Sequence, residues 1–247
     1  MKFKYVILSV AAAAVLCGCK GEGLLIGDVY KKGHSESFVL TYFHPENFNP
    51  IASDGFILLG FNRETTEEYG FYSKDKADKA RYREKCERYG DFGFDYNFRY
   101  SPTDRWMHAF QDYEFQRIEI TSDKDFDAAH EAGTLLADVF VFVSVSPIRF
   151  IRSGYTDKAD WSDAPENACA FLGYDPEREY YHPVYGIVSE LDPADLILLG
   201  GHDNYDMRIG WLVPSVQPEV AGTHRLCIRL FTVDGEVLEG TVDYTFK

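Results

Sequence analysis

The sequence predicts an all-β protein with minor α content: an antiparallel β-sandwich carrying one inserted surface helix. Short apolar or alternating runs rich in aromatic and β-branched residues recur along the chain, separated by Pro, Asn, Asp and Gly. The chain ends in two long strand-like runs around Asp234-Gly235. Strands do not alternate with helices as in a parallel α/β fold. Immunoglobulin-like connectivity is the candidate topology, although the sequence lacks a Cys-Trp-Cys core signature.

The N-terminal residues predict export. Two lysines precede an apolar run, Tyr5–Leu16, which is followed by a small residue, Gly18, and by Cys19. As a helix this run covers roughly 18 Å, whereas the hydrocarbon of a bilayer is about 30 Å thick. A basic segment, a short apolar core and a small residue form, in that order, a cleaved signal peptide, here residues 1–18.

The cleavage site resembles the bacterial lipobox. Leu16 and Gly18 stand three residues and one residue before Cys19. The resemblance implies that Cys19 receives diacylglycerol and becomes the mature N-terminus. Each buried acyl CH2 contributes about 0.8 kcal/mol, so such an anchor replaces a transmembrane helix. The alternative is an ordinary secretory signal in which Cys19 has no role.

Residues 19–35, with several glycines and a tandem lysine pair, predict a lipidated tether. Within it, Leu24–Ile26 is an alternative first edge strand. Residues 36–247 predict a single β-sandwich-like domain. The alternative is two small β domains divided within residues 153–183, a stretch rich in Asp, Pro and Tyr.

The strand-like runs before the terminal pair are short, apolar or alternating, and bounded by turn residues. They are Phe38–Phe43, Phe56–Phe61, Phe92–Arg99, Tyr113–Thr121, Val139–Val145, Tyr185–Ser189, Leu196–Leu199 and Met207–Val213.

One segment, SKDKADKARYREKCERY from Ser73, predicts a helix over residues 74–89. It lacks Gly and Pro, and Tyr82, Cys86 and Tyr89 recur at the spacing of one apolar stripe. Ser73 is the expected N-cap, and Gly90 the expected stop. We interpret its Lys and Arg residues as a solvated face, with a site for an acidic partner as the alternative.

The terminal runs Thr223–Val233 and Val237–Phe246 predict a hairpin. A two-residue loop would mix charged and apolar side chains on both faces, whereas a three-residue loop, Asp234–Glu236, separates them. We prefer the second register, although it makes Gly235 central where such a loop usually has Gly last; a bulge in either strand would give the same parity. The expected apolar face consists of Leu226, Ile228, Leu230, Val242 and Tyr244.

Charge excludes one class of partner. The formal charge is −15, and it becomes −17 when cleavage removes Lys2 and Lys4. A chain this acidic repels phosphate backbones, so nucleic acid is not an expected partner. After cleavage and lipidation Cys86, Cys169 and Cys227 remain, and they allow at most one internal disulfide. We expect them to be small buried hydrophobes.

Three alternating carboxylates, Asp123, Asp125 and Asp127, match the start of an EF-hand calcium loop. The rest of that motif is missing, because Ala128 stands where the turn needs Gly and Thr134 where a bidentate Glu belongs. We expect Asp123 and Asp127 to bond backbone N–H groups in a turn. A calcium site of another type is the alternative, and no other cofactor is expected.

Two sets of side chains are candidates for ligand binding. Aromatic residues form 16% of the chain, enough for some to stack on sugar rings or anchor a protein partner while the others fill the core. The aromatic candidates are Trp161, Tyr155, Tyr180 and Tyr181. A polar loop between two apolar runs has groups that bind sugar hydroxyls or a metal, or that form a plain connection. Its candidates are His202, Asp203, Asn204 and Asp206.

Common catalytic and nucleotide-binding motifs are missing from the sequence: H-E-x-x-H, G-x-S-x-G, the P-loop and G-x-G-x-x-G do not occur. The lipobox, the acidic aromatic body and the run SDKDFDAAHEAGT from Ser122 to Thr134 resemble uncharacterised envelope lipoproteins of Bacteroidota. The resemblance implies a lipid-anchored protein of the cell envelope, in the outer membrane, and supplies no catalytic residues. Lys20-Gly21-Glu22 partly matches the signal for surface export in that group.

We therefore expect a non-catalytic module that binds a ligand or partner, either a glycan or a protein, and that contacts the membrane through its lipid. The alternatives are an extracytoplasmic hydrolase and a structural subunit of an envelope assembly.

Overall fold

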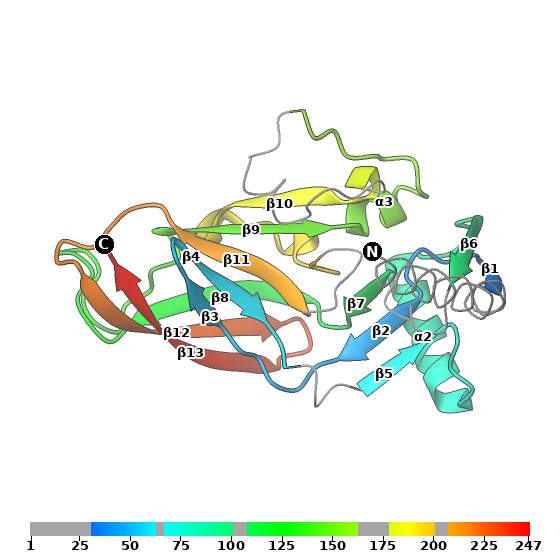
Figure 1. Cartoon of the computed structure of the whole chain (residues 1–247), viewed down its shortest axis with the longest axis horizontal. Coiled ribbons are helices and arrows are strands. Elements are labelled where there is room, and N and C mark those ends of the chain that lie inside the picture. Colours follow the sequence, from blue (N-terminus) through cyan, green and yellow to red (C-terminus); the bar gives the residue numbers. More distant parts are fainter. Residues whose placement is uncertain (1–30, 63–66, 101–107, 163–177, 201–206) are drawn as a thin grey trace, which may run out of the picture. The chain divides into compact units, whose positions relative to one another are not determined.

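The computed structural model describes residues 31–62, 67–100, 108–162, 178–200 and 207–247. The chain divides into two compact units. In the first, β1 (Lys31–Ser35) pairs antiparallel with β6 (Tyr96–Tyr100), so the last residues of the predicted tether form a strand. All other described elements belong to the second unit, residues 36–94 and 106–247 (Figure 1). The predicted signal peptide, Cys19 and Leu24–Ile26 lie outside the described residues.

The second unit contains the predicted sandwich, made of two antiparallel sheets. One sheet has the order β13-β12-β8, and the other β10-β9-β11-β4-β3. The strands are β3 (Ile51–Ser53), β4 (Phe56–Gly60), β8 (Phe115–Ser122), β9 (Phe140–Ser146), β10 (His182–Ile187), β11 (Arg208–Pro214), β12 (Gly222–Thr232) and β13 (Val237–Phe246).

The strand order is that of an immunoglobulin constant-type sandwich. When β3, β4, β8, β9, β11, β12 and β13 are lettered A to G in chain order, the sheets become A-B-E-D and C-F-G, and every neighbouring pair is antiparallel. Strand β10 pairs with β9 and so extends the A-B-E-D sheet beyond strand D. The sandwich prediction is confirmed, and the order agrees with the candidate topology.

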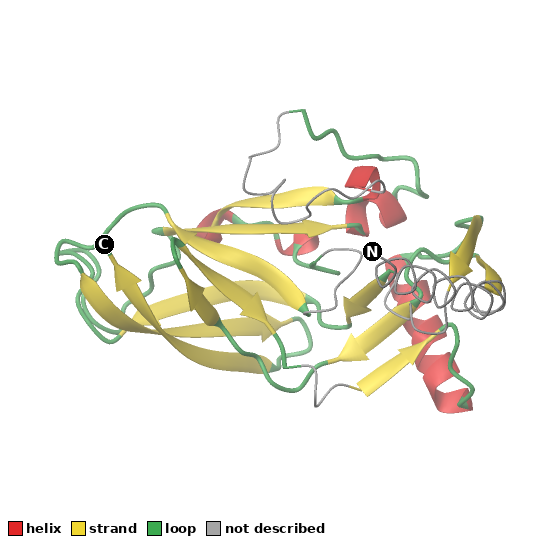
Figure 2. Cartoon of the chain, in the orientation of Figure 1, coloured by secondary structure: helices red, strands yellow, loops and turns green. Residues whose placement is uncertain are grey.

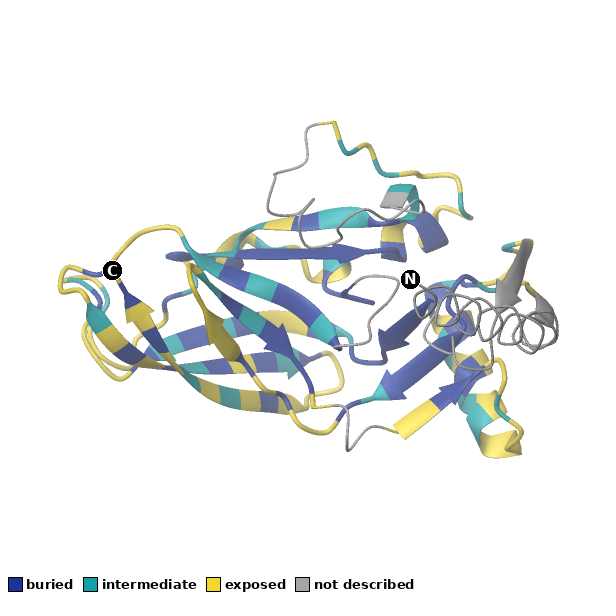
Figure 3. Cartoon of the chain, viewed as in Figure 1, coloured by how far each residue is buried: buried dark blue, intermediate teal, exposed yellow. Residues whose placement is uncertain are grey.

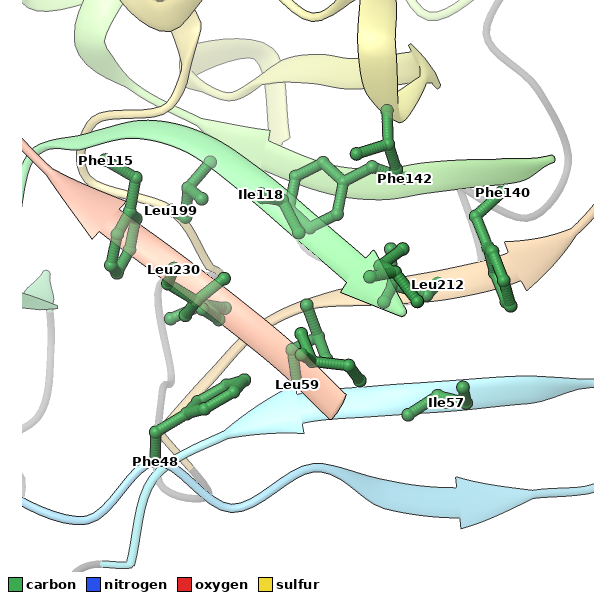
Figure 4. Close-up of a cluster of buried hydrophobic side chains, with 14 of the residues drawn as sticks. Phe48, Ile57, Leu59, Phe115, Ile118, Phe140, Phe142, Leu199, Leu212 and Leu230 are labelled. Carbon is green, nitrogen blue, oxygen red and sulfur yellow. The ribbon is translucent and has the colours of Figure 1, made fainter. Parts of the chain in front are cut away.

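Side chains from the two sheets meet in one apolar core (Figure 4). Leu59, Phe142 and Leu212 come from one sheet, and Ile118 and Leu230 from the other, and all five are buried. Burying one such side chain contributes about 1.5–3 kcal/mol. This core fills the space between the sheets, as the alternating pattern of the strands predicts.

The terminal hairpin has the predicted faces and a different loop. Leu230 lies opposite Leu238 and Phe231 opposite Val237, so the loop is Val233-Asp234-Gly235. Gly235 comes last and has φ 87, the left-handed conformation that the final position of a three-residue loop requires. The prediction placed the loop one residue too late. Figure 3 shows buried and exposed residues alternating along β12 and β13.

A second group of elements is formed by one strand that precedes strand A and by segments inserted between strands B and C. Strands β2 (Thr41–His44), β5 (Glu67–Gly70) and β7 (Ala109–Gln111) form a sheet of order β5-β2-β7, and α2 (Lys76–Tyr89) packs against β5 (Figure 2). We call these four elements and their connecting loops the inserted lobe. The pairing of β2 with β7 is parallel, which the sequence did not predict.

Helix α2 confirms the predicted helix and its apolar stripe, since Tyr82, Cys86 and Tyr89 are its buried residues. It begins later than expected: Asp75 is the N-cap, and its side chain accepts hydrogen bonds from the N–H groups of residues 77 and 78. Gly90, with φ 74, ends the helix as predicted.

Several predicted strands have different bounds. The Phe38–Phe43 and Phe92–Arg99 runs become strands only at Thr41 and Tyr96. The Tyr185–Ser189 run corresponds to β10, which ends at Ile187 because η3 (Val188–Glu190) follows. The Leu196–Leu199 run is a loop that follows η4 (Pro193–Asp195), with one isolated bridge between Ile197 and Glu114.

Two short helices, α3 (Ile148–Arg152) and η2 (Arg178–Tyr180), flank the aromatic candidates. Cys86 is buried and Cys227 half-buried, and both are free thiols. Cys169 lies outside the described residues. Within the part of the chain that the structure describes, none of the helices has the length and apolar character needed to cross a bilayer.

Candidate functional site

The three alternating carboxylates point at different backbone groups. Asp123 Oδ1 accepts from Arg225 N at 2.8 Å, and Asp125 Oδ1 accepts from Ala132 N at 2.8 Å. Asp127 Oδ1 accepts from the N–H groups of residues 129 and 130 and lies 2.8 Å from His130 Nδ1. These bonds are those expected of a turn, and a calcium ion would have to replace several of them. Among the described residues, no group of three or more His, Cys, Asp or Glu is placed to hold a metal.

The predicted aromatic candidates gather in one place and point inward. Tyr181 is fully buried, while Tyr155, Tyr180 and Trp161 are half-buried and pack against the same cluster. Tyr180 stacks on Phe150 with ring centroids 4.6 Å apart. All four rings contribute to the packing of this cluster. The polar loop candidates, His202, Asp203, Asn204 and Asp206, lie outside the described residues.

Phe38 is the centre of this aromatic cluster. Its ring stacks on His108 at 4.2 Å and meets four other rings edge-on. The Phe38 backbone is held on both sides, because its N–H donates to Asp91 Oδ1 at 2.6 Å and its carbonyl oxygen lies 2.7 Å from His108 Nδ1. Asp91 Oδ2 accepts from Val39 N at 2.9 Å. The segment before β2 is therefore fixed by two distant side chains.

A cavity of about 420 Å³ opens beside α2, next to this cluster. We call it the Phe92 cavity. Its size is in the range of small-ligand sites. It is lined by Ser37, Tyr82, Arg83, Cys86, Glu87, Asp91 and Phe92.

Phe92 is the most exposed aromatic side chain of the described residues, at 61%. It lies between two glycines in the left-handed region, Gly90 with φ 74 and Gly93 with φ 92. Its N–H donates to the Gly90 carbonyl oxygen at 3.1 Å. This glycine-framed turn holds an apolar ring in solvent at the edge of the cavity. At this position the ring adds apolar surface that a ligand in the cavity would contact.

The inner wall and the rim of the cavity differ in chemistry. Inside, Asp91 is fully buried, and burial raises its pKa to about 6 against the lowering effect of its backbone hydrogen bonds. Burial, and then the nearby Asp91 charge, raise the pKa of the Cys86 thiol to about 11, so this thiol is not activated. At the rim, Arg83 and Glu87 are exposed and lie one helical turn apart. The rim offers both donors and acceptors to a ligand.

The Phe92 cavity was not predicted from the sequence. Phe92 belonged to a predicted strand, and the cationic side chains of α2 to a predicted solvated face. The available signal was Gly90-Asp91-Phe92-Gly93, an aromatic residue between two glycines directly after a helix stop.

A second polar cluster lies on the other side of α2. The buried Asp112 carboxylate lies 2.8 Å from His44 Nδ1, and it accepts from Tyr69 Oη at 2.8 Å and from Arg81 Nη2 at 2.9 Å. Lys85 Nζ donates to the Asp112 carbonyl oxygen at 2.7 Å. Part of the cationic face of α2 thus faces the lobe and is not free for an acidic partner. The side chains of this polar cluster come from four separate segments of the chain, so no local motif revealed them.

Comparison with protein-family models, with curated proteins and with solved structures finds no match for this chain. The chain's own residues and their geometry are therefore the basis for inferring its function.

Proposed function

We propose that this protein is a non-catalytic binding module, held in the cell envelope by a lipid on Cys19, whose ligand or partner occupies the Phe92 cavity. The observation that carries the proposal is Phe92 itself, a 61% exposed ring that two glycines hold beside a cavity of about 420 Å³. Exposing an aromatic ring to water is unfavourable, and stacking or packing it on a partner is therefore favourable. A glycan and a protein segment both provide such a surface.

The position of the cavity agrees with a binding role. Strand β2 of the inserted lobe precedes strand A, and β5, α2 and β7 lie between strands B and C, so the lobe belongs to the end where the B–C and F–G loops meet. In variable immunoglobulin domains the loops of that end form the binding surface. Here the β12–β13 loop contacts the lobe as well, since Val233 N donates to the Glu114 carbonyl oxygen at 2.9 Å. This likeness concerns topology and supports the location of the site, not the identity of the ligand.

The test is a thermal-shift screen of the mature, lipidated chain in mild detergent against oligosaccharides, peptides and divalent metals including calcium. A ligand at 100 times its dissociation constant adds about 2.7 kcal/mol to the folded state, which raises Tm by several degrees. We expect a hit whose shift disappears in Phe92→Ala and persists in Phe71→Ala. Phe71 is a matched control because it is also exposed, at 39%, and does not line the cavity. A ligand whose Tm shift is unchanged in both variants would contradict the proposed site.

The lipid anchor is tested separately by membrane fractionation. Cys19→Ala should release the protein from the membrane fraction, because it removes the acceptor of the lipid. Cys17→Ala is the matched control, since residue 17 is removed with the signal peptide and its loss should change nothing. Retention of Cys19→Ala in the membrane would refute lipidation.

One observation favours the alternative of an extracytoplasmic hydrolase. Asp112 holds His44 by Nδ1, the His44 side chain is 33% exposed, and Nε2, which lies 3.5 Å from Tyr113 Oη, is the nitrogen that would act as a general base. The screen for this alternative uses chromogenic esters and glycosides, with His44→Gln as the variant and His34→Gln as the control. Turnover that His44→Gln abolishes would establish the hydrolase; turnover equal to buffer would leave the binding module.

A further inference from the structure

Asp91 is a buried charge whose hydrogen-bond partners are all neutral. Its carboxylate accepts from two backbone N–H groups, of residues 38 and 39, and from Tyr155 Oη at 2.9 Å. Among the described residues, no Lys or Arg forms an ion pair with it. The other titratable groups that face it are the phenols of Tyr42 and Tyr82, the Cys86 thiol and the His108 imidazole. The three donors hold the carboxylate in place without supplying a positive charge.

Asp91 belongs to the wall of the Phe92 cavity, and its side chain is fully buried there. Burying a carboxylate without a Lys or Arg partner is costly, which agrees with the raised pKa of Asp91, about 6, even though the nearby His108 imidazole acts to lower it. At neutral pH the group is nevertheless ionised. A cation entering the cavity would gain from this charge more than it does in water, because the effective dielectric constant at the wall is lower.

The rim supplies the remaining parts of a cation site. Phe92 presents an exposed ring, and a cation above such a ring gains roughly 0.5–1 kcal/mol. Glu87 adds a second carboxylate. Arg83 opposes a cation, but the lining residues still carry one more negative than positive formal charge. An anion would be repelled by Asp91 and Glu87, and a neutral ligand would gain less from these two charges than a cation does.

We propose that the Phe92 cavity binds an organic cation, a primary ammonium or guanidinium group, with its charged head toward Asp91 and Glu87 and its apolar stem on the Phe92 ring. This inference rests on the proposed function, because it names the ligand class of the same cavity. Such a group occurs on a lysine or arginine side chain of a partner and on a free amine.

The test is isothermal titration of the mature chain with agmatine, with N-acetyl-lysine methylamide and with a lysine-containing peptide. Maltotriose and N-acetyl-methionine methylamide are the uncharged controls. Binding of the free amines as well as the peptide would assign the site to small cations; binding of the peptide alone would assign it to a protein partner. Either result supports the cation, and binding of maltotriose or the methionine derivative alone overturns it.

Two matched variants on one face of α2, Glu87→Gln and Arg83→Gln, test whether the ligand carries a positive charge. Glu87→Gln should weaken cation binding about two- to fivefold, and Arg83→Gln should strengthen it by a similar factor. Phe92→Leu, which keeps an apolar side chain and removes the ring, should also weaken it about two- to fivefold. Arg83, Glu87 and Phe92 are all exposed, so folding is checked by a cooperative melt.

The pH dependence separates this inference from the proposed function. Cation binding should weaken as the pH falls from 7 through about 6, where Asp91 takes up a proton. If cations do not bind while a neutral ligand binds in a Phe92-dependent manner, the proposed ligand class is wrong and the proposal of a binding module is retained. If Phe92→Ala changes the binding of no ligand in the panel, both fall.

Discussion

The sandwich and the inserted lobe are held together in different ways. The sandwich core consists of apolar side chains from two sheets, among them Leu59, Phe142 and Leu230. The lobe shares an aromatic cluster around Phe38 with the segment that contains α3, and it adds two carboxylates with little or no exposure, Asp91 and Asp112. Apolar packing tolerates substitutions of similar volume, whereas a buried carboxylate depends on each of its donors. The lobe therefore depends on buried charge, and through Asp91 it responds to pH.

The largest expected effect lies in the sandwich. Phe142→Ala removes a fully buried ring between the sheets and should lower the free energy of unfolding by about 3–5 kcal/mol. Gly210 leaves the space that this ring fills, since a Cβ there would lie 2.4 Å from it. Urea unfolding measures the loss. A decrease below about 1 kcal/mol would show that the two sheets do not share this core.

A smaller, pH-dependent effect belongs to Asp91. Burial raises its pKa from 3.8 to about 6, so between these values the folded state keeps a proton that the unfolded state has lost. Relative to Asp91→Asn, the wild type should therefore lose up to roughly 3 kcal/mol of unfolding free energy as the pH rises from about 4 to about 6. Above pH 6 the difference should be constant. Parallel pH profiles of the two proteins would contradict the raised pKa.

Asp112 gives a second test of the lobe. Asp112→Asn keeps the shape of the side chain and weakens the bonds to His44, Tyr69 and Arg81, at a cost of about 2 kcal/mol. Asp243→Asn is the matched control, because Asp243 lies on the exposed face of β13 and should change stability by at most about 0.5 kcal/mol. Chemical unfolding at neutral pH compares them, and equal losses would remove the distinction between the two regions.

The smallest effect lies on the sandwich surface. Arg229 Nε donates to Glu239 Oε2 at 2.8 Å across β12 and β13, and both side chains are about half exposed. Arg229→Gln should lower the free energy of unfolding by much less than Asp112→Asn does, because solvent screens exposed pairs. A loss that matches that of Asp112→Asn would mean that surface pairs contribute to stability as buried ones do.

The same difference explains which parts of the fold the sequence predicted. Strands β12 and β13 show a period-2 pattern, so their faces followed from Leu226, Ile228 and Leu230 alone. Helix α2 followed from local spacing and from Gly90. The exact loop did not, because parity fixes the faces but not a shift of both strands around Gly235.

The candidate site could not be predicted in the same way. The bond between Asp91 and the backbone of Phe38 joins residues 53 positions apart, and Asp112 meets Tyr69 across 43. Such contacts leave no periodic pattern in the sequence. The composition correctly showed many aromatic residues, but burial separates Tyr181, which packs inside, from Phe92, which is exposed. Only the fold makes that distinction.

Native-state hydrogen exchange of the wild type and Asp112→Asn tests most directly whether the lobe is held by its own polar bonds. Peptides covering β2, β5 and β7 should lose protection in the variant, because Asp112 and its partners tie these strands to α2. Peptides covering β9 and β12 should keep the protection that they have in the wild type, since their amides belong to the apolar sandwich. An equal loss of protection over both regions would show one undivided core and contradict this account.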